Sequence, residues 1–218
     1  MNLKTRTGSS HSIVAQLLVP ILTMQALACS ASTDSTASVD ERDQPLGTAE
    51  SAIFYPTKYH IEAFHSGKCL DVPAERQDDN GVLIQQWQCW SDVDSSPQQL
   101  WGFDQKETDE FGNPVFQIAS RSSSYDKCLD VLDGVMRAGQ PVQQWDCSAD
   151  TVQQRWIQEP TDYYDADDNR YWLYRSKKNR AYCLDVSGVS SANGARLQIW
   201  PCHGGINQRF VNVPRGDL

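Results

Sequence analysis

The sequence lacks any run of basic residues. Its 218 residues contain 19 Lys and Arg against 28 Asp and Glu, which gives a formal charge of −9 at pH 7. Nucleic acids and anionic membrane surfaces attract clusters of Lys and Arg, so this composition argues against both as partners. There is also no stretch of about 18 or more apolar residues, which argues against a lasting membrane span.

Sequence signatures of enzymes are missing as well. The chain has no Gly-x-Ser-x-Gly, His-Glu-x-x-His or P-loop motif. Beyond residue 28 the histidines are His60, His65 and His203, and the last two lie near cysteines, where a polar loop residue is expected more often than a ligand. We therefore predict a non-catalytic protein that uses no cofactor and no metal.

Seven cysteines are many for a cytosolic protein, and the N-terminus explains them. Lys4 and Arg6 give a short basic start, residues 13–22 are mostly apolar, and small residues precede a cleavage point after Ala28. This layout predicts a secretory signal peptide over residues 1–28. Export places the chain in an oxidising compartment, where paired cysteines form disulfides.

Cys29 would be the first residue after cleavage. Ala28-Cys29-Ser30 resembles a bacterial lipoprotein box, in which that cysteine is lipidated and anchors the protein to the membrane. The alternative is ordinary cleavage that leaves an unpaired thiol. Residues 29–51 are rich in Ser, Thr, Ala and Asp, which predicts a flexible linker. We expect a protein that is secreted or lipid-anchored at a bacterial cell envelope.

One pattern occurs three times after residue 51, with spacings of 59 and 55 residues between its copies. Each copy begins with Cys-Leu-Asp-Val, continues through a Gly-containing turn to Gln-x-Trp, and reaches a second Cys two residues later. A further Gln-x-aromatic segment closes the copies at Trp101, Trp156 and Phe210. Such repetition indicates one supersecondary unit that is used three times.

The repeated units have the character of β-structure. They are rich in aromatic and β-branched residues, they are punctuated by turn residues, and residues 59–64 alternate between polar and apolar. Three copies of a few strands predict an all-β domain over residues 52–218, closed into a pseudo-threefold barrel, because closure leaves no exposed sheet edge. We expect this domain to be a monomer.

Six of the cysteines fall into the repeats. Spacing by itself does not decide how they pair, but the threefold repeat favours one bridge within each unit. The expected bridges are Cys69–Cys89, Cys128–Cys147 and Cys183–Cys202, with separations of 20, 19 and 19 residues. Closing loops of this length should contribute about 3 kcal/mol each.

This pairing brings an aspartate close to a tryptophan. Side chains alternate between the faces of a strand, so Cys69 and Asp71 share one face while Leu70 and Val72 point into the core. If the disulfide joins neighbouring antiparallel strands, counting two residues from each Cys places Asp71 beside Trp87. The same count pairs Asp130 with Trp145 and Asp185 with Trp200.

An Asp beside a Trp is suited to binding a sugar. The C–H face of a pyranose ring stacks on an aromatic side chain, while a carboxylate accepts hydrogen bonds from hydroxyls and Gln amides both donate and accept. Two other interpretations stay open: the Trp packs against the disulfide, and the Asp caps a turn. The threefold repetition of Asp, Gln and Trp favours sugar binding.

Residues 59–211 resemble the ricin-B-type lectins, which have a β-trefoil fold with three sugar-binding lobes. The resemblance implies that each Asp binds vicinal hydroxyls, that each Trp before the second Cys stacks on the sugar, and that the closing aromatics are structural. The implied carbohydrate-binding residues are Asp71, Gln85, Trp87, Gln98 and Gln99 in the first lobe, Asp130, Gln143, Trp145, Gln153 and Gln154 in the second, and Asp185, Gln198, Trp200, Asn207 and Gln208 in the third.

The lobes differ just before the closing aromatic. The family usually has Asn-Gln there, and the third unit keeps it as Asn207-Gln208. The first two units have Gln-Gln instead, and the extra methylene of Gln moves the amide. A misplaced hydrogen-bond partner costs on the order of 1–3 kcal/mol, so we predict that the third lobe binds most tightly.

Two acidic insertions, residues 102–114 and 158–170, make these units longer than the family's usual unit. They read as extended hairpins. The stretch Asp165-x-Asp167-Asp168-Asn169 faintly resembles a calcium loop, but it lacks the required Gly and distal Glu, which favours a solvated turn.

We therefore predict non-catalytic binding of galactose-like or xylan-like glycans. The alternative is a protein-interaction module, such as a trefoil protease inhibitor, that uses a loop in place of the sugar lobes.

Overall fold

The computed structural model describes residues 57–91 and 96–215. The expected signal peptide, the linker and Cys29 lie outside this part of the chain. In the part described, no helix has the length and apolar character needed to cross a membrane.

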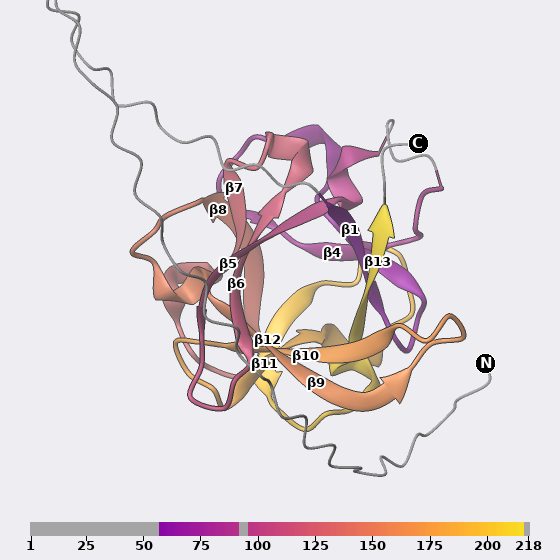
Figure 1. Cartoon of the computed structure of the whole chain (residues 1–218). Coiled ribbons are helices and arrows are strands. Elements are labelled where there is room, and N and C mark those ends of the chain that lie inside the picture. The colour runs from indigo at the N-terminus through magenta and orange to yellow at the C-terminus, as the bar shows by residue number, and fades with distance from the viewer. Residues whose placement is uncertain (1–56, 92–95, 216–218) are drawn as a thin grey trace, which may run out of the picture. The chain divides into compact units, whose positions relative to one another are not determined.

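Six strands form a closed barrel (Figure 1). Each pairs in antiparallel fashion with its two neighbours in the order β1, β13, β10, β9, β6, β5 and back to β1. The barrel strands are β1 (Lys58–Ala63), β5 (Trp101–Thr108), β6 (Pro114–Ser120), β9 (Trp156–Tyr164), β10 (Arg170–Ser176) and β13 (Phe210–Arg215). This confirms the predicted closed all-β architecture.

Each repeat adds one hairpin to the barrel. The hairpin strands are β2 (Lys68–Asp71) with β4 (Gln85–Trp87), β7 (Lys127–Val131) with β8 (Gln140–Asp146), and β11 (Tyr182–Val186) with β12 (Leu197–Pro201). The short strand β3 (Val82–Leu83) pairs with β8. We call β1 to β5 lobe 1, β6 to β9 lobe 2, and β10 to β13 lobe 3.

Short 3₁₀ helices connect these strands. They are η1 (Ala74–Arg76), η2 (Pro97–Gln99), η3 (Arg121–Ser123), η4 (Leu132–Gly134), η5 (Val152–Gln154), η6 (Ser187–Val189) and η7 (Ile206–Gln208). One of them, η2, η5 or η7, stands just before the closing aromatic of each lobe, so the second Gln-x-aromatic motif marks a turn that leads into the last barrel strand.

The closing aromatics form the centre of the core. Trp101, Trp156 and Phe210 are fully buried. The indole N–H of Trp101 donates to the carbonyl oxygen of Leu70 at 3.2 Å, and that of Trp156 donates to Leu129 at 2.9 Å. Each of these tryptophans therefore fastens its barrel strand to the hairpin of its own lobe, which confirms the expected structural role.

All three predicted disulfides are present. Cys69–Cys89, Cys128–Cys147 and Cys183–Cys202 each bridge Cα atoms 5.0 Å apart, within the range that a disulfide requires. Each bridge lies inside one lobe and closes a loop of about 20 residues, which restricts the unfolded chain.

The acidic insertions form the β5–β6 and β9–β10 hairpins, as predicted, and these hairpins join consecutive lobes. In the second turn the Asp165 carboxylate accepts the backbone N–H of Asp167 and Asn169 at 2.9 and 2.8 Å. Asp109 makes the same contacts in the first turn. The carboxylate of Asp165 thus closes a turn, which agrees with the solvated turn predicted there.

Candidate functional site

Each lobe has a hollow beside its hairpin. The hollow of lobe 1 has a volume of about 590 Å³, that of lobe 2 about 370 Å³ and that of lobe 3 about 350 Å³. The three hollows contain the same trio of residues: Asp71, Gln85 and Trp87, then Asp130, Gln143 and Trp145, then Asp185, Gln198 and Trp200. The fold therefore brings the predicted Asp, Gln and Trp of each repeat together.

The aspartates are held by amide donors from the facing strand. Asp71 lies directly opposite Gln85, and the Gln85 side-chain amide donates to its Oδ1 at 2.8 Å. In the other two lobes the same contact measures 2.9 Å, from Gln143 to Asp130 and from Gln198 to Asp185. One carboxylate oxygen is thus fixed in the same way three times.

The second carboxylate oxygen is held from behind. Gln99 donates to Oδ2 of Asp71 at 3.1 Å, and Gln208 donates to Oδ2 of Asp185 at 3.0 Å. In lobe 2 the Gln154 amide donates to the backbone carbonyl of Asp146 at 2.9 Å, and Gln154 lowers the pKa of Asp130. These three glutamines are fully buried. They support the carboxylates, whereas Gln98 and Gln153 line the hollows.

Lobe 3 has one donor more. The Asn207 amide donates to Oδ2 of Asp185 at 2.8 Å and to the backbone carbonyl of Val186 at 3.0 Å. Asn207 therefore fixes the carboxylate and the strand that carries it. Gln98 and Gln153 stand at the corresponding positions of the other lobes, so the sequence difference before the closing aromatic coincides with a difference in how the Asp is held.

Burial dominates the electrostatics of the three carboxylates. It raises the pKa of Asp71, Asp130 and Asp185 above the ordinary value, although the amide donors pull each pKa back down. The donors offset part of the cost of holding a negative charge in a partly dehydrated place. Each carboxylate is therefore poised as a hydrogen-bond acceptor beside the aromatic ring.

The tryptophans present their rings to the solvent. Trp145 is 45 % exposed and Trp200 is 41 % exposed, whereas Trp87 is partly buried. The register corrects one detail of the sequence count, because Trp87 lies opposite Cys69 and the disulfide runs diagonally to Cys89, beyond the end of β4. Trp87 and Asp71 still share one face, as diagonal neighbours.

Each tryptophan rests on a glycine of another lobe. A Cβ at Gly81 would lie 3.8 Å from the Trp145 ring, one at Gly139 would lie 3.7 Å from Trp200, and one at Gly194 would lie 3.9 Å from Trp87. All three glycines have φ near 80°, the left-handed region that favours glycine. Lobe 1 thus supports the site of lobe 2, lobe 2 that of lobe 3, and lobe 3 that of lobe 1.

The sequence pattern showed a glycine in each unit but assigned it only to a turn. Backbone hydrogen bonds fix the contact between lobes: the N–H of Gly81 donates to Gln144, that of Gly139 to Ile199, and that of Gly194 to Gln86, at 2.9–3.0 Å. A pattern inside one repeat carries no information about which neighbour it touches, so sequence reasoning missed this role.

The residue directly after the second Cys also belongs to the site. It is Trp90 in lobe 1, Ser148 in lobe 2 and His203 in lobe 3, and each lines the hollow of its lobe. His203, interpreted from sequence as an ordinary loop residue, has its Nε2 3.8 Å from Asp185. Repetition could not reveal this position, because its residue type changes from lobe to lobe.

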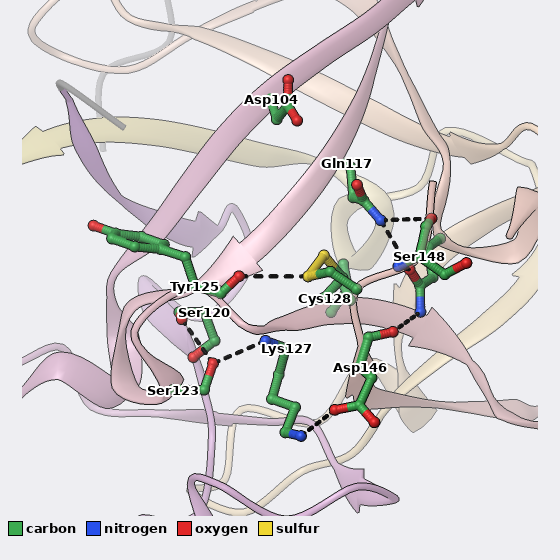
Figure 2. The surroundings of a disulfide bond; sticks show 12 residues. Asp104, Gln117, Ser120, Ser123, Tyr125, Lys127, Cys128, Asp146 and Ser148 are labelled. Carbon is green, nitrogen blue, oxygen red and sulfur yellow. Dashed lines mark hydrogen bonds and ion pairs between the residues drawn. A yellow bond between two sulfur atoms is a disulfide. The ribbon is translucent and has the colours of Figure 1, made fainter. Parts of the chain in front are cut away.

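Figure 2 shows this region in lobe 2, around the Cys128–Cys147 disulfide. Lys127 and Asp146 form an ion pair across β7 and β8, and the Gln117 amide donates to the backbone carbonyl of Ser148 at 3.1 Å. Asp146 also accepts a hydrogen bond from the Asn80 amide of lobe 1 at 2.7 Å. Asn80 of lobe 1 therefore supports Asp146, which lines this hollow.

The chain matches the family model described as "Ricin-type beta-trefoil lectin domain-like" over residues 54–145 and 97–200. Among solved structures, a designed threefold-symmetric protein, ThreeFoil, is 27 % identical with a TM-score of 0.56, covering 74 % of this chain and 99 % of that chain. The earthworm R-type lectin C-half, in complex with GalNAc, is 22 % identical with a TM-score of 0.50, covering 73 % and 100 %.

An exo-β-1,3-galactanase from Clostridium thermocellum, 1,3Gal43A, is 27 % identical with a TM-score of 0.57 over 72 % of this chain, but only 30 % of that enzyme is covered. The likeness to the enzyme therefore concerns a part of it. Because the family model spans more than half of the 218 residues and the fold repeats the same hairpin and disulfide three times, the chain belongs to the ricin-type β-trefoil lectin domain-like family.

Proposed function

We propose that this protein binds carbohydrate without catalysis, through the three hollows, and that galactose-type sugars are its ligands. The observation that carries the proposal is the threefold recurrence of one arrangement: a buried, amide-held aspartate beside a tryptophan ring that is exposed in lobes 2 and 3 and partly exposed in lobe 1. The earthworm lectin crystallised with GalNAc has the same fold, which supports the choice of sugar class.

The carboxylate has unused acceptor positions that can bind two neighbouring hydroxyls. An ionised carboxylate offers about four acceptor positions, and in lobe 1 Gln85 and Gln99 use two of them. The rest can accept from two vicinal hydroxyls of a pyranose. The apolar face of the same ring then lies on Trp87, which excludes water from both partners.

The lobes hold a sugar rather than react with it. In each hollow a Gln side-chain amide donates to the aspartate, which leaves the carboxylate available as a hydrogen-bond acceptor. The fully buried Gln99, Gln154 and Gln208 serve as supports behind this acceptor. The match to the galactanase covers less than a third of that enzyme.

We further propose that the protein works outside the cytoplasm. The three disulfides suit an oxidising compartment. The basic and apolar N-terminal segment supports export, and Cys29 supports a lipid anchor.

Calorimetric titration with galactose, GalNAc, lactose and xylobiose tests the proposal. We expect wild-type binding of the galactose-type sugars and its loss in the Trp87→Ala, Trp145→Ala, Trp200→Ala triple variant. Phe111→Ala is the matched control, because Phe111 is an aromatic side chain that is 72 % exposed in the β5–β6 turn, away from the hollows. Sugar binding that survives the triple substitution would refute the stacking model. A wild-type protein that binds none of these sugars would favour the protein-interaction module.

A further inference from the structure

The hollow of lobe 1 differs from the other two in size and in aromatic content. Its volume of about 590 Å³ compares with about 370 and 350 Å³ in lobes 2 and 3. It contains two tryptophans, Trp87 and Trp90, whereas each of the other hollows contains one. Trp90 is 51 % exposed. Lobe 1 therefore presents a second aromatic surface inside the same hollow.

One glutamine, Gln99, binds both the backbone of Trp90 and the carboxylate of Asp71. The Gln99 amide oxygen accepts the N–H of Trp90 at 2.9 Å, while the Gln99 amide nitrogen donates to Asp71 at 3.1 Å. One buried side chain therefore fixes both the acceptor and the position that carries the second ring.

In the other lobes an equivalent glutamine accepts the same backbone N–H, but the side chain at that position differs. Gln154 accepts the N–H of Ser148 at 2.9 Å, and Gln208 accepts the N–H of His203 at 2.9 Å. The backbone is thus equivalent in all three lobes, and the side chain after the second Cys is free to differ. A constant frame with one variable side chain is the arrangement of a specificity-determining position.

We propose that lobe 1 binds an extended saccharide of at least two pyranose residues, with one ring on Trp87 and the next on Trp90, whereas lobes 2 and 3 bind a single pyranose. This inference rests on the proposed carbohydrate binding and adds the ligand size that each lobe accepts. A half-exposed tryptophan leaves a large apolar area in water, and stacking of a second ring would remove much of that area.

Polar groups at the edge of the hollow complete the case for a second ring. Glu75 and Arg76 of η1 line the same hollow. They offer an acceptor and a donor for hydroxyls, so a second pyranose would meet both an apolar platform and polar partners, as the first one does on Trp87 and Asp71.

The test isolates lobe 1 in the full chain by Trp145→Ala and Trp200→Ala. The probes are galactose and β-1,3-linked galactobiose and galactotriose, titrated by calorimetry. We expect Trp90→Ser, which installs the lobe 2 residue, to weaken binding of the two oligosaccharides about tenfold and to leave galactose within about twofold. Trp90→Phe keeps an aromatic platform and should restore most of the oligosaccharide affinity.

The reverse graft gives an independent check. Ser148→Trp, in a chain that keeps only lobe 2 through Trp87→Ala and Trp200→Ala, should raise the galactobiose affinity over the galactose affinity.

The inference is wrong if Trp90→Ser weakens galactose binding as much as galactobiose binding, or weakens neither. In either case the wild-type binding of galactose, and its loss with Trp87→Ala, still support the proposed function. If no sugar binds the wild-type protein, the proposed function fails first.

Discussion

At the scale of single residues, the three sites differ in how many amides hold the carboxylate. Asp185 has donors in Gln198, Asn207 and Gln208. A carboxylate that is already fixed loses less freedom when a sugar arrives, so its hydrogen bonds contribute more to affinity. The short Asn207 side chain donates both to Oδ2 of Asp185 and to the backbone carbonyl of Val186 in β11.

Asn207→Gln should therefore weaken the binding of galactose to lobe 3. In a chain that keeps only lobe 3, through Trp87→Ala and Trp145→Ala, we expect a loss of about 1–3 kcal/mol by titration. Gln98→Asn in a lobe 1 chain is the converse change and should strengthen binding. An unchanged affinity in the lobe 3 variant would show that the added methylene is harmless, and the predicted ranking of the lobes would then be wrong.

At the scale of elements, the β5–β6 hairpin is fastened to lobe 3 through its turn. The Asp109 carboxylate is fully buried and accepts a hydrogen bond from the Arg180 guanidinium at 2.7 Å, and Arg180 also lies over the Phe111 ring at 4.9 Å. Burial alone would raise the pKa of Asp109, but Arg180 and the donors of Asn113 and Phe111 outweigh it and hold the pKa well below the ordinary 3.8.

This depressed pKa predicts an acid-sensitive contact. The folded state binds a proton at Asp109 less readily than the unfolded state, so the stabilisation is complete above pH 3.8 and is lost as the pH falls below it. Asp109→Asn should lower the free energy of unfolding at neutral pH by about 1.5–3 kcal/mol and reduce its dependence on acid. Urea denaturation between pH 2 and pH 7 measures both effects.

Asp165→Asn is the control for this variant, because Asp165 closes an equivalent turn on the β9–β10 hairpin. We expect a smaller loss there. Equal losses in the two variants would mean that the turn geometry, and not the contact with Arg180, is responsible.

At the scale of the whole molecule, the lobes are interdependent because each tryptophan lies on a glycine from elsewhere. Gly139 belongs to lobe 2, yet it approaches Trp200 and Gln198 of lobe 3. Gly139→Ala should cost about 1–2 kcal/mol of stability because its φ is positive. The added Cβ would lie in ordinary contact with Trp200, so we expect strain in the turn that supports Trp200, and not a clash, to weaken sugar binding several-fold in lobe 3 while lobe 2 keeps its affinity.

Gly112→Ala is the control, because it introduces the same backbone strain in a turn that supports no tryptophan. Gly112 has a similar φ of 84°, and a Cβ there would meet nothing within 4 Å. Titration of chains that retain one lobe should show normal lobe 3 binding for Gly112→Ala. If Gly139→Ala weakens lobe 2 instead of lobe 3, the coupling between lobes described above is wrong.

Much of this molecule was predictable because it is repeated. Three copies of the Cys-Leu-Asp-Val and Gln-x-Trp motifs predicted the closed barrel, the three disulfides and the meeting of Asp with Trp. The diagonal course of the disulfides was not predictable, because both a direct and a diagonal bridge satisfy the same spacing. The role of Trp90 was not predictable either, because lobes 2 and 3 have Ser148 and His203 at that position.

The pairing of β1 with β13 closes the barrel without a covalent link. All six residue pairs, from Lys58 opposite Arg215 to Ala63 opposite Phe210, are antiparallel, so the outer ends of these two strands lie side by side (Figure 1). A pulling force applied at Lys58 and Arg215 would therefore load one residue pair at a time and separate the two strands sequentially from that end. The disulfides lie within the lobes, so tension would part the ring at this seam while each hairpin keeps its cross-link.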